Sequence, residues 1–424
     1  MNLKDKGIMI VDTGLATHMA QVMARSFGKV FYFIPDSDAY PKTDRDEIGM
    51  GIPGAERVLD VYEHIHVDPA ERDVDLFFFT DTGFSGLQNL LLEMGYNVAG
   101  SLYSDLMELD KDKFYKTLAK VGLPVAPTTK VVGISVLRKH LQKNENVVVK
   151  ISKHRGLTET RKVCDYSDAE PWLDDIEAQL GMKKDSQIFL VQEMIESECE
   201  TGMDSLCLDG QHPDNSMMGI EAKDAGYFGC VVKKYPPIIQ DINDKMAPIY
   251  KKLGYQGMHS NELRITKDGV AYSIDETCRM PSPPGELFPE MYEDDNFAQA
   301  IWALGGGIMP TLKPKAKYGA EIILTSEWYG KGHWLKVSFP KEIEQFVKLK
   351  NFCIRDGEYW VIPNDNDGYI GAVVAVGDDS DKVMDLCLEY AEQVKGYKVA
   401  YSHDVFCDIK DSCEAAAKHG IKIL

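Results

Sequence analysis

The first hundred residues alternate short apolar runs with amphipathic stretches. Residues 7–34 contain an apolar strand, a glycine turn, an amphipathic helix over 15–27 and a second strand, which is the pattern of a βαβ unit. Residues 74–101 repeat this order of strand, turn, helix and short strand. Because apolar strands separated by helices are typical of parallel sheets, we expect a parallel α/β domain over residues 1–105.

The pattern changes twice further along the chain. Residues 106–310 contain two extended regions, a hairpin over 258–279 that turns at residues 267–269, and a helix over 286–304 that stops at three glycines. From about residue 317, strand segments accompany one amphipathic helix over 379–394. We therefore expect a multidomain protein of the α/β and α+β classes, with a small α+β domain over 311–424 packed near the N-terminal domain.

Composition limits the classes of function. The 424 residues carry 47 Lys and Arg against 67 Asp and Glu, and the net charge of −20 disfavours stable nucleic-acid binding. No apolar run approaches the roughly 18 residues that span a bilayer, so we expect a cytoplasmic protein without a membrane partner. The nine cysteines are scattered without a CxxC pair, which favours buried free thiols over disulfides or zinc ligands.

The hairpin ends in the segment DETCR, which carries acidic and basic side chains. Antiparallel pairing is expected to bring Glu262 beside Asp275, and alternation places Thr277 and Arg279 on the same face as Asp275. Two adjacent carboxylates are tolerated when a cation such as Mg²⁺ lies between them, with Thr277 as a further ligand and Arg279 as a phosphate contact. The alternative is a strand that exposes one polar face to water.

Cationic residues and a loop point to a phosphorylated ligand. Lys150 closes the apolar run NVVVK, where a buried ammonium requires an anionic partner, and Lys111 lies at a helix start. The basic loop over 152–161 includes Lys153 and Gly156 and is expected to cover a polyphosphate. The alternative for these lysines is that they extend to solvent.

Two further sets of residues are candidate contacts. Glu193 ends an apolar strand, and it precedes Met194 and Ile195, whose backbone is expected to reach adenine, while Glu200 is placed for ribose hydroxyls. The strand-to-helix turns at Gly14 and at residues 81–83, which include Asp81 and Gly83, fall where small ligands bind parallel sheets. The alternatives are solvated carboxylates and glycines that only close tight turns.

The order of these features resembles the ATP-grasp superfamily. The resemblance implies an ATP-grasp domain over 106–310 with a lid over roughly 125–195, and ATP and Mg²⁺, or Mn²⁺, as cofactors. In that superfamily the second metal-binding acid lies in a Glu-x-Asn-x-Arg pattern, which Asp275, Thr277 and Arg279 match with two substitutions. The resemblance makes Lys111, Lys150 and Arg279 the groups that offset phosphate charge, with Lys150 and Arg279 assigned to catalysis.

Within the superfamily the chain resembles the phosphoribosylamine-glycine ligase family over nearly its whole length. The segments that carry this resemblance are VDTGLATHMAQVMA, LMELDKDKF, VGLPVAP and IDETCRMPSPPGE. It implies that His18 contacts substrate, although a helical histidine is also a common packing residue. The first turn, the loop after Lys150 and the segment after Arg279 depart from the family, and these parts face the substrate in the resemblance.

The expected function is an ATP-dependent carboxylate-amine ligase that forms an amide through an acyl phosphate. Its substrates are expected to be an amino acid and a small amine or nucleotide-like acceptor. The alternatives are phosphoribosylamine-glycine ligase itself and a nucleotide-binding protein without catalysis. We expect a monomer or a homodimer.

Overall fold

The N-terminal part of the chain forms a parallel sheet with helices on both faces. The structure is a computed structural model that describes residues 2–36, 43–152, 160–364 and 368–424. Five parallel strands run in the order β3-β2-β1-β4-β5, namely β1 (Gly7–Val11), β2 (Lys29–Phe33), β3 (Glu56–Val58), β4 (Leu76–Phe79) and β5 (Asn97–Ala99). Helices α1 (His18–Ala24) and α9 (Asn296–Gly305) cover one face, and α3 (Ser85–Glu93) covers the other. Alternate residues of β1 point into the two hydrophobic cores that lie on opposite faces of this sheet, which explains why the strand is apolar throughout.

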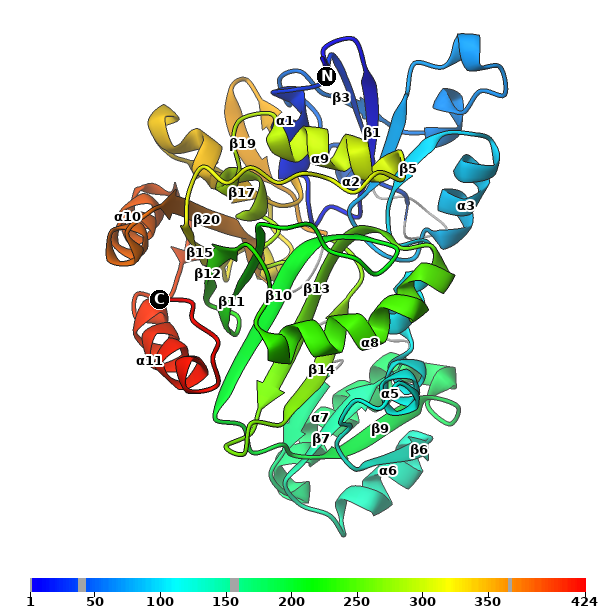
Figure 1. Ribbon diagram of the computed structural model, residues 1–424, viewed down its shortest axis with the longest axis vertical. Coiled ribbons are helices and arrows are strands. Elements are labelled where there is room, and N and C mark those ends of the chain that lie inside the picture. The colour runs from blue at the N-terminus through cyan, green and yellow to red at the C-terminus, as the bar shows by residue number, and fades with distance from the viewer. Residues whose placement is uncertain (1, 37–42, 153–159, 365–367) are drawn as a thin grey trace.

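A nine-stranded sheet occupies the centre of the molecule (Figure 1). Its path is β14-β13-β10-β11-β12-β15-β20-β17, with β22 paired to β15. The strands are β10 (Cys199–Leu208), β11 (Ser216–Ala222), β12 (Gly226–Val232), β13 (Gln256–Ile265), β14 (Ala271–Thr277), β15 (Tyr318–Ser326), β17 (Val347–Leu349), β20 (Tyr369–Gly377) and β22 (Val399–Ala400). Strands from the C-terminal part of the chain therefore extend the sheet that carries the acidic hairpin.

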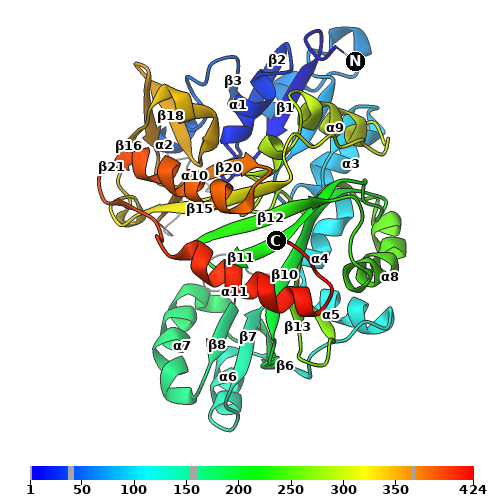
Figure 2. The same cartoon turned by 60° about the vertical axis from the view of Figure 1, so that its left-hand side comes forward.

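Helices cover the rear face of this sheet, defined as the face that bears Asn261 and Glu276. Helix α8 (Pro237–Leu253) donates a hydrogen bond from Tyr250 to Glu276, and α11 (Val405–Lys418) packs on β10, β11 and β12 (Figure 2). Helix α10 (Ser380–Gln393) packs on β15 and β20. The opposite, front face of the hairpin bears Glu262 and Asp275.

A separate four-stranded antiparallel sheet, in the region predicted to be a lid, lies at the far end of the molecule from the N-terminal sheet (Figure 1). Its order is β6-β9-β7-β8, with β6 (Thr128–Val132), β7 (Val147–Ile151), β8 (Thr160–Val163) and β9 (Ile188–Glu193). Helices α6 (Ile134–Leu141) and α7 (Tyr166–Leu180) pack against it in a hydrophobic core of their own. Helices α4 (Asp105–Leu109) and α5 (Lys111–Lys120) connect the N-terminal sheet to the lid.

The structure differs from the sequence predictions in two elements. The predicted helix over 286–304 is instead a 3-10 turn, Phe288–Met291, followed by α9, because Tyr292 bridges to Pro314 and Asp295 has a left-handed backbone. The C-terminal region has a second helix, α11, and a four-stranded sheet with β16 (Leu335–Ser338), β18 (Phe352–Arg355), β19 (Glu358–Val361) and β21 (Lys395–Gly396). Among the described residues, no helix has the length and apolarity required to span a membrane.

Candidate active site

The acidic hairpin pairs as the sequence predicts, with one irregularity. Glu262 of β13 lies directly opposite Asp275 of β14, so both side chains face the front of the sheet. The register then shifts, because Leu263 pairs with Ser273 and leaves Ile274 without a partner on β13. Such a bulge releases a backbone carbonyl from the ladder, and the Ile274 carbonyl accepts hydrogen bonds from Lys150 and Tyr115.

Two buried lysines converge on this bulge from different elements. Lys111 of α5 places Nζ 2.9 Å from Asp275 Oδ1, and Lys150 of β7 donates from Nζ to the Ile274 carbonyl at 2.5 Å. Tyr115, one turn after Lys111, donates to the same carbonyl at 2.7 Å, and its ring centroid is 5.6 Å from Lys150 Nζ. Lys111 and Lys150 are 4% and 6% exposed. The structure therefore assembles two cations and two carboxylates from three distant segments.

The two carboxylates have opposite electrostatic environments. Burial opposes ionisation of Asp275, but Lys111 and Lys150 outweigh it and lower the pKa of Asp275 to about 2. Burial, followed by repulsion from Asp275 and Glu200, raises the pKa of Glu262 to about 7. A divalent cation between them would remove this repulsion, so the pair has the chemistry of a magnesium ligand set. Thr277 pairs with Ser260 on the same front face.

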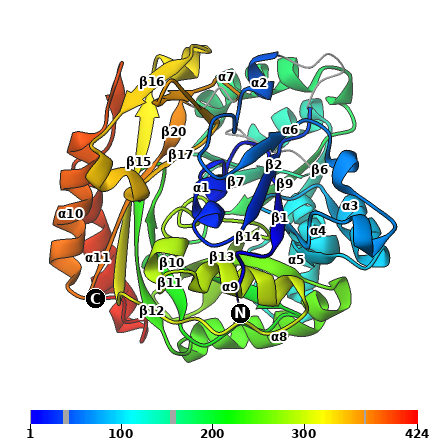
Figure 3. The ribbon, with the colours of Figure 1, turned by 90° about the horizontal axis from the view of Figure 1, so that it is seen from above.

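The turns of the N-terminal sheet meet the end of the hairpin. Thr13 donates from its hydroxyl to Asp81 at 2.6 Å, which joins the turns after β1 and β4. Arg279 lies beyond β14 and places Nε 2.8 Å from Glu108 and 3.5 Å from Asp81. Seen from above, the N-terminal sheet lies over β13 and β14 (Figure 3). Asp81 and Arg279 are thus brought together. Gly83, two residues after Asp81, donates its N–H to Asp105 at 3.3 Å.

A cavity of about 40 Å³ lies beside Glu262 on the front face. Its floor contains Gly202 and Gly219. Tyr227 lies across Gly219, so a side chain at position 219 would overlap the Tyr227 hydroxyl. Tyr227 donates to the buried Asp204 at 2.6 Å. The front face therefore continues from the acidic pair into a small polar pocket.

The predicted adenine and ribose contacts line the junction of lid and central sheet. Glu193 ends β9 with an exposed side chain, and its N–H donates to the Pro127 carbonyl at 3.0 Å; Met194 and Ile195 follow it at intermediate exposure. Glu200 forms an ion pair with Arg264 in this structure. Their roles in nucleotide binding stay predictions.

Other predicted residues lie elsewhere or outside the description. His18 lines a separate cavity of about 280 Å³ with Arg25 and Lys348, and burial followed by the Lys348 charge lowers the pKa of His18, which keeps the ring neutral. Gly14 packs against the C-terminal region, since its carbonyl accepts from the N–H of Asn351 at 2.9 Å. The structure does not describe Lys153 or Gly156, which belong to residues 153–159.

Four site residues were not predicted from the sequence. Tyr115 lies four residues after Lys111, so helical spacing could have placed both on one face. Glu108 accepts from the Cys278 N–H at 2.8 Å and from Arg279, contacts that bridge 170 residues and leave no local pattern. The pairing of Asp204 with Tyr227 depends on the register of three strands and is likewise invisible in the sequence.

The lid, the bulged acidic hairpin, the converging lysines and the parallel N-terminal sheet together define a protein with the ATP-grasp fold. Neither the protein-family models nor the curated protein sequences include a match to this chain. Solved structures do match across nearly the whole chain. Phosphoribosylamine-glycine ligase from Thermotoga maritima is similar with a TM-score of 0.68 and 14% identity, covering 94% of this chain and 99% of that one.

Two other solved structures show the same likeness. The biotin carboxylase domain of 2-oxoglutarate carboxylase from Hydrogenobacter thermophilus, in complex with MgADP, ADP and bicarbonate, has a TM-score of 0.65 at 12% identity and covers 92% of this chain and 91% of its own. L-amino acid ligase from Bacillus licheniformis has a TM-score of 0.57 at 15% identity and covers 94% and 99%. At these identities the likeness establishes the fold and leaves the substrate open.

Proposed function

We propose that this protein is an ATP-dependent ligase that joins a small carboxylate, such as an amino acid, to an amine. The observation that carries the proposal is the convergence of Lys111 and Lys150 on a bulged hairpin that presents Glu262 and Asp275. Buried ammonium groups beside a carboxylate pair suit a triphosphate with a divalent cation. The Hydrogenobacter thermophilus domain of the same fold was solved with MgADP, which supports this choice of ligand.

The proposed reaction has two steps. A carboxylate oxygen of the substrate attacks the γ-phosphorus of ATP, the bond from this phosphorus to the β,γ-bridging oxygen breaks, and ADP leaves with an acyl phosphate formed. The amine then attacks the acyl carbon, inorganic phosphate leaves with the electron pair of the broken C–O bond, and the amine releases a proton. The role of the protein is to position the reactants and to offset charge.

Each of the site residues has a proposed role in that reaction. Lys111 and Lys150 bind phosphate oxygens, and Glu262, Asp275 and Thr277 hold Mg²⁺, which when bound neutralises triphosphate charge. Arg279 orients the anionic substrate at the border with the turn of Asp81, where Glu108 fixes its guanidinium. The predicted lid over about residues 125–195, which includes Lys153 and Gly156, covers the nucleotide.

Phosphoribosylamine-glycine ligase remains the second candidate because the enzyme from Thermotoga maritima matches over 94% of this chain. The likeness to L-amino acid ligase over the same share supports a different amine acceptor. The first turn, the segment after Lys150 and the segment after Arg279 depart from the phosphoribosylamine-glycine ligase family, and by resemblance these segments face the substrate. The departures therefore favour an amine acceptor other than phosphoribosylamine. A nucleotide-binding protein without turnover is the third outcome.

The test is ADP release from ATP with a panel of amino acids and amines that includes phosphoribosylamine with glycine. Turnover that requires phosphoribosylamine selects the second candidate, and ATP binding without ADP release from any pair selects the third. Asp275→Asn is expected to abolish turnover and leave the fold intact, while Asp268→Asn, at the exposed turn of the same hairpin, is the matched control. Full turnover in Asp275→Asn would contradict the assigned metal role.

A further inference from the structure

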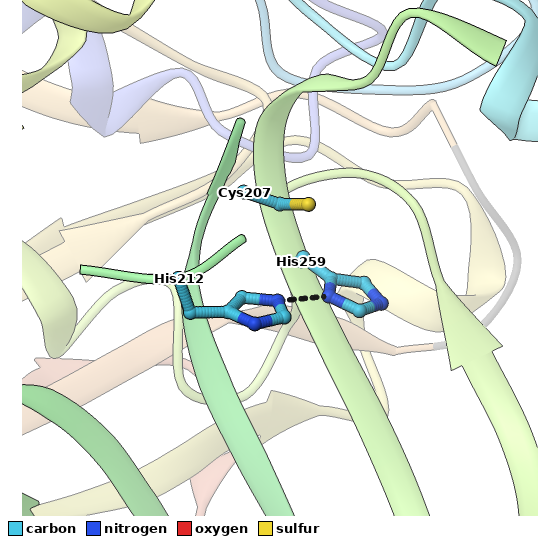
Figure 4. Close-up of side chains that lie close together, drawn as sticks. All are labelled: Cys207, His212 and His259. Carbon is cyan, nitrogen blue, oxygen red and sulfur yellow. Dashed lines mark hydrogen bonds between the residues drawn. The ribbon is translucent and has the colours of Figure 1, made fainter. Parts of the chain in front are cut away.

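The rear face of the central sheet holds a second cluster of reactive side chains. Cys207 lies near the end of β10, His259 lies on the neighbouring β13, and His212 lies in the loop after β10. Cys207 Sγ, His212 Nε2 and His259 Nδ1 all lie within 4.8 Å of one another (Figure 4). This cluster is on the opposite face of the sheet from Glu262 and Asp275, so it is separate from the candidate active site.

The spacing of these atoms is close to that of a metal ligand set. His212 Nε2 and His259 Nδ1 are 2.9 Å apart and share a hydrogen bond. Tetrahedral zinc, with bonds of about 2.0–2.3 Å to nitrogen and sulfur, places its ligand atoms about 3.3–3.6 Å apart. Side-chain movements of about 1 Å therefore convert the hydrogen-bonded cluster into a coordination sphere with three protein ligands.

The surroundings supply the outer partner that a ligating histidine normally has. His259 uses its second nitrogen, Nε2, for a hydrogen bond with Glu276, which also accepts from Tyr250 and Asn261. A carboxylate behind a histidine fixes the ring and the nitrogen that faces the metal. A divalent ion, the Cys207 thiolate and the Glu276 carboxylate would sum to zero charge, which a buried site requires.

Access to the cluster is also suitable for metal binding. Cys207 and His259 are 0% and 2% exposed, whereas His212 is partly exposed. The lining of a surface cavity of about 640 Å³ includes Leu208, Asp209 and Gln211, which lie between Cys207 and His212 in the sequence.

We propose that Cys207, His212 and His259 bind one divalent cation of the zinc class, with water in the fourth position on the side of His212. Two imidazoles and one thiolate select zinc or cobalt over Mg²⁺, which prefers oxygen ligands. Binding releases a proton from the Cys207 thiol, because the thiolate is the ligand. The site links β10, its following loop and β13, and it does not depend on the proposed ligase activity.

Cobalt titration of the full-length, chelator-treated protein tests this site. We expect one Co²⁺ per chain with tetrahedral ligand-field bands in the visible and a thiolate-to-cobalt charge-transfer band in the near ultraviolet. Cobalt bound at an all-oxygen site, such as Glu262 with Asp275, produces no thiolate band. Excess Zn²⁺ is expected to displace cobalt and to raise the melting temperature.

Two variants and a control decide the outcome. Cys207→Ser is expected to remove the charge-transfer band, and His212→Gln, at the partly exposed ligand, to weaken cobalt binding by at least about tenfold. Cys199→Ser alters another buried cysteine of β10 and is expected to bind like the unaltered chain. Circular dichroism checks that each variant folds. Absence of the thiolate band in the unaltered chain, or its persistence in Cys207→Ser, would overturn the proposal.

Discussion

A buried ion cluster between the N-terminal helix and the C-terminal strands offers a quantitative test of the fold. Glu290 is 1% exposed and accepts from Lys348 Nζ at 2.6 Å and from Arg25 Nη1 at 2.8 Å. Burial opposes ionisation of Glu290, but Lys348 and Arg25 lower its pKa to about 2. Relative to the usual value of 4.5, this shift corresponds to about 3 kcal/mol of stability.

Glu290→Gln removes the charge and keeps the shape of the side chain. Burial already lowers the pKa of Lys348, and without Glu290 its ammonium is left buried beside Arg25. We expect the free energy of unfolding at pH 7 to fall by about 3–5 kcal/mol, the cost of breaking a buried ion pair. Because the pKa of Glu290 is lowered, its contribution is present above about pH 4.5 and is lost as the pH falls towards 2.

Urea unfolding of the two proteins at pH 7 and at pH 3 measures this difference. The gap between their midpoints is expected to be large at pH 7 and to narrow at pH 3. Glu342→Gln, at an exposed glutamate, is the matched control and is expected to change little. In the double variant with Lys348→Met, no ammonium is left buried at position 348 without its carboxylate partner, so part of the stability should return. Equal midpoints at pH 7, or an unchanged gap at pH 3, would refute the reasoning.

Three further predictions concern single residues. Lys150→Ala is expected to weaken binding of an ATP analogue by about 10–100-fold in calorimetry, because a charged donor is lost. Lys162→Ala, at an exposed lysine, is expected to change this affinity little. Equal affinities of the two variants would remove Lys150 from the site. Burial raises the pKa of Asp204 to about 6, so the stability that the protonated carboxyl contributes is lost as the pH rises through 6. Asp204→Asn should therefore stabilise the protein by up to about 3 kcal/mol at pH 8, and not at pH 4, in urea unfolding. Gly14→Ala is expected to cost about 1–3 kcal/mol in the same assay, because the added carbon lies 1.8 Å from the Asn351 oxygen at a φ of +104°.

The parts of the fold that follow from local patterns could be predicted from the sequence. The alternation of apolar strands and amphipathic helices indicated the parallel N-terminal sheet, and the hairpin turn indicated the antiparallel pairing of β13 with β14. The expected α/β and α+β architecture is confirmed by the likeness to the Thermotoga maritima ligase. The helix expected over 286–304 was wrong because residues between the turn and α9 form a bridge with a distant segment.

The parts of the site that depend on long-range contacts could not be predicted. No sequence signal marks Ile274 as the bulged residue, yet its carbonyl receives both Lys150 and Tyr115. Similarly, Glu198 pairs with His419 at 2.9 Å, a contact across 221 residues that brings the end of α11 to the start of β10. Sequence spacing rules for zinc ligands also miss the proposed site at Cys207, because its two histidine partners come from a loop and from another strand.

The bulge at Ile274 explains how one strand serves two different sites. Without it, strict alternation would place Ser273 on the same face as Asp275, whereas Ser273 hydrogen-bonds Asn261 on the rear face at 2.7 Å. After the bulge, Asp275 faces the lysines in front and Glu276 faces the histidine behind. Consecutive residues of β14 thus anchor the candidate nucleotide site and the proposed zinc site, so the strand's register determines both. A deletion of Ile274 would restore regular pairing and keep Asp275 opposite Glu262, but it would remove the carbonyl that receives Lys150 and Tyr115.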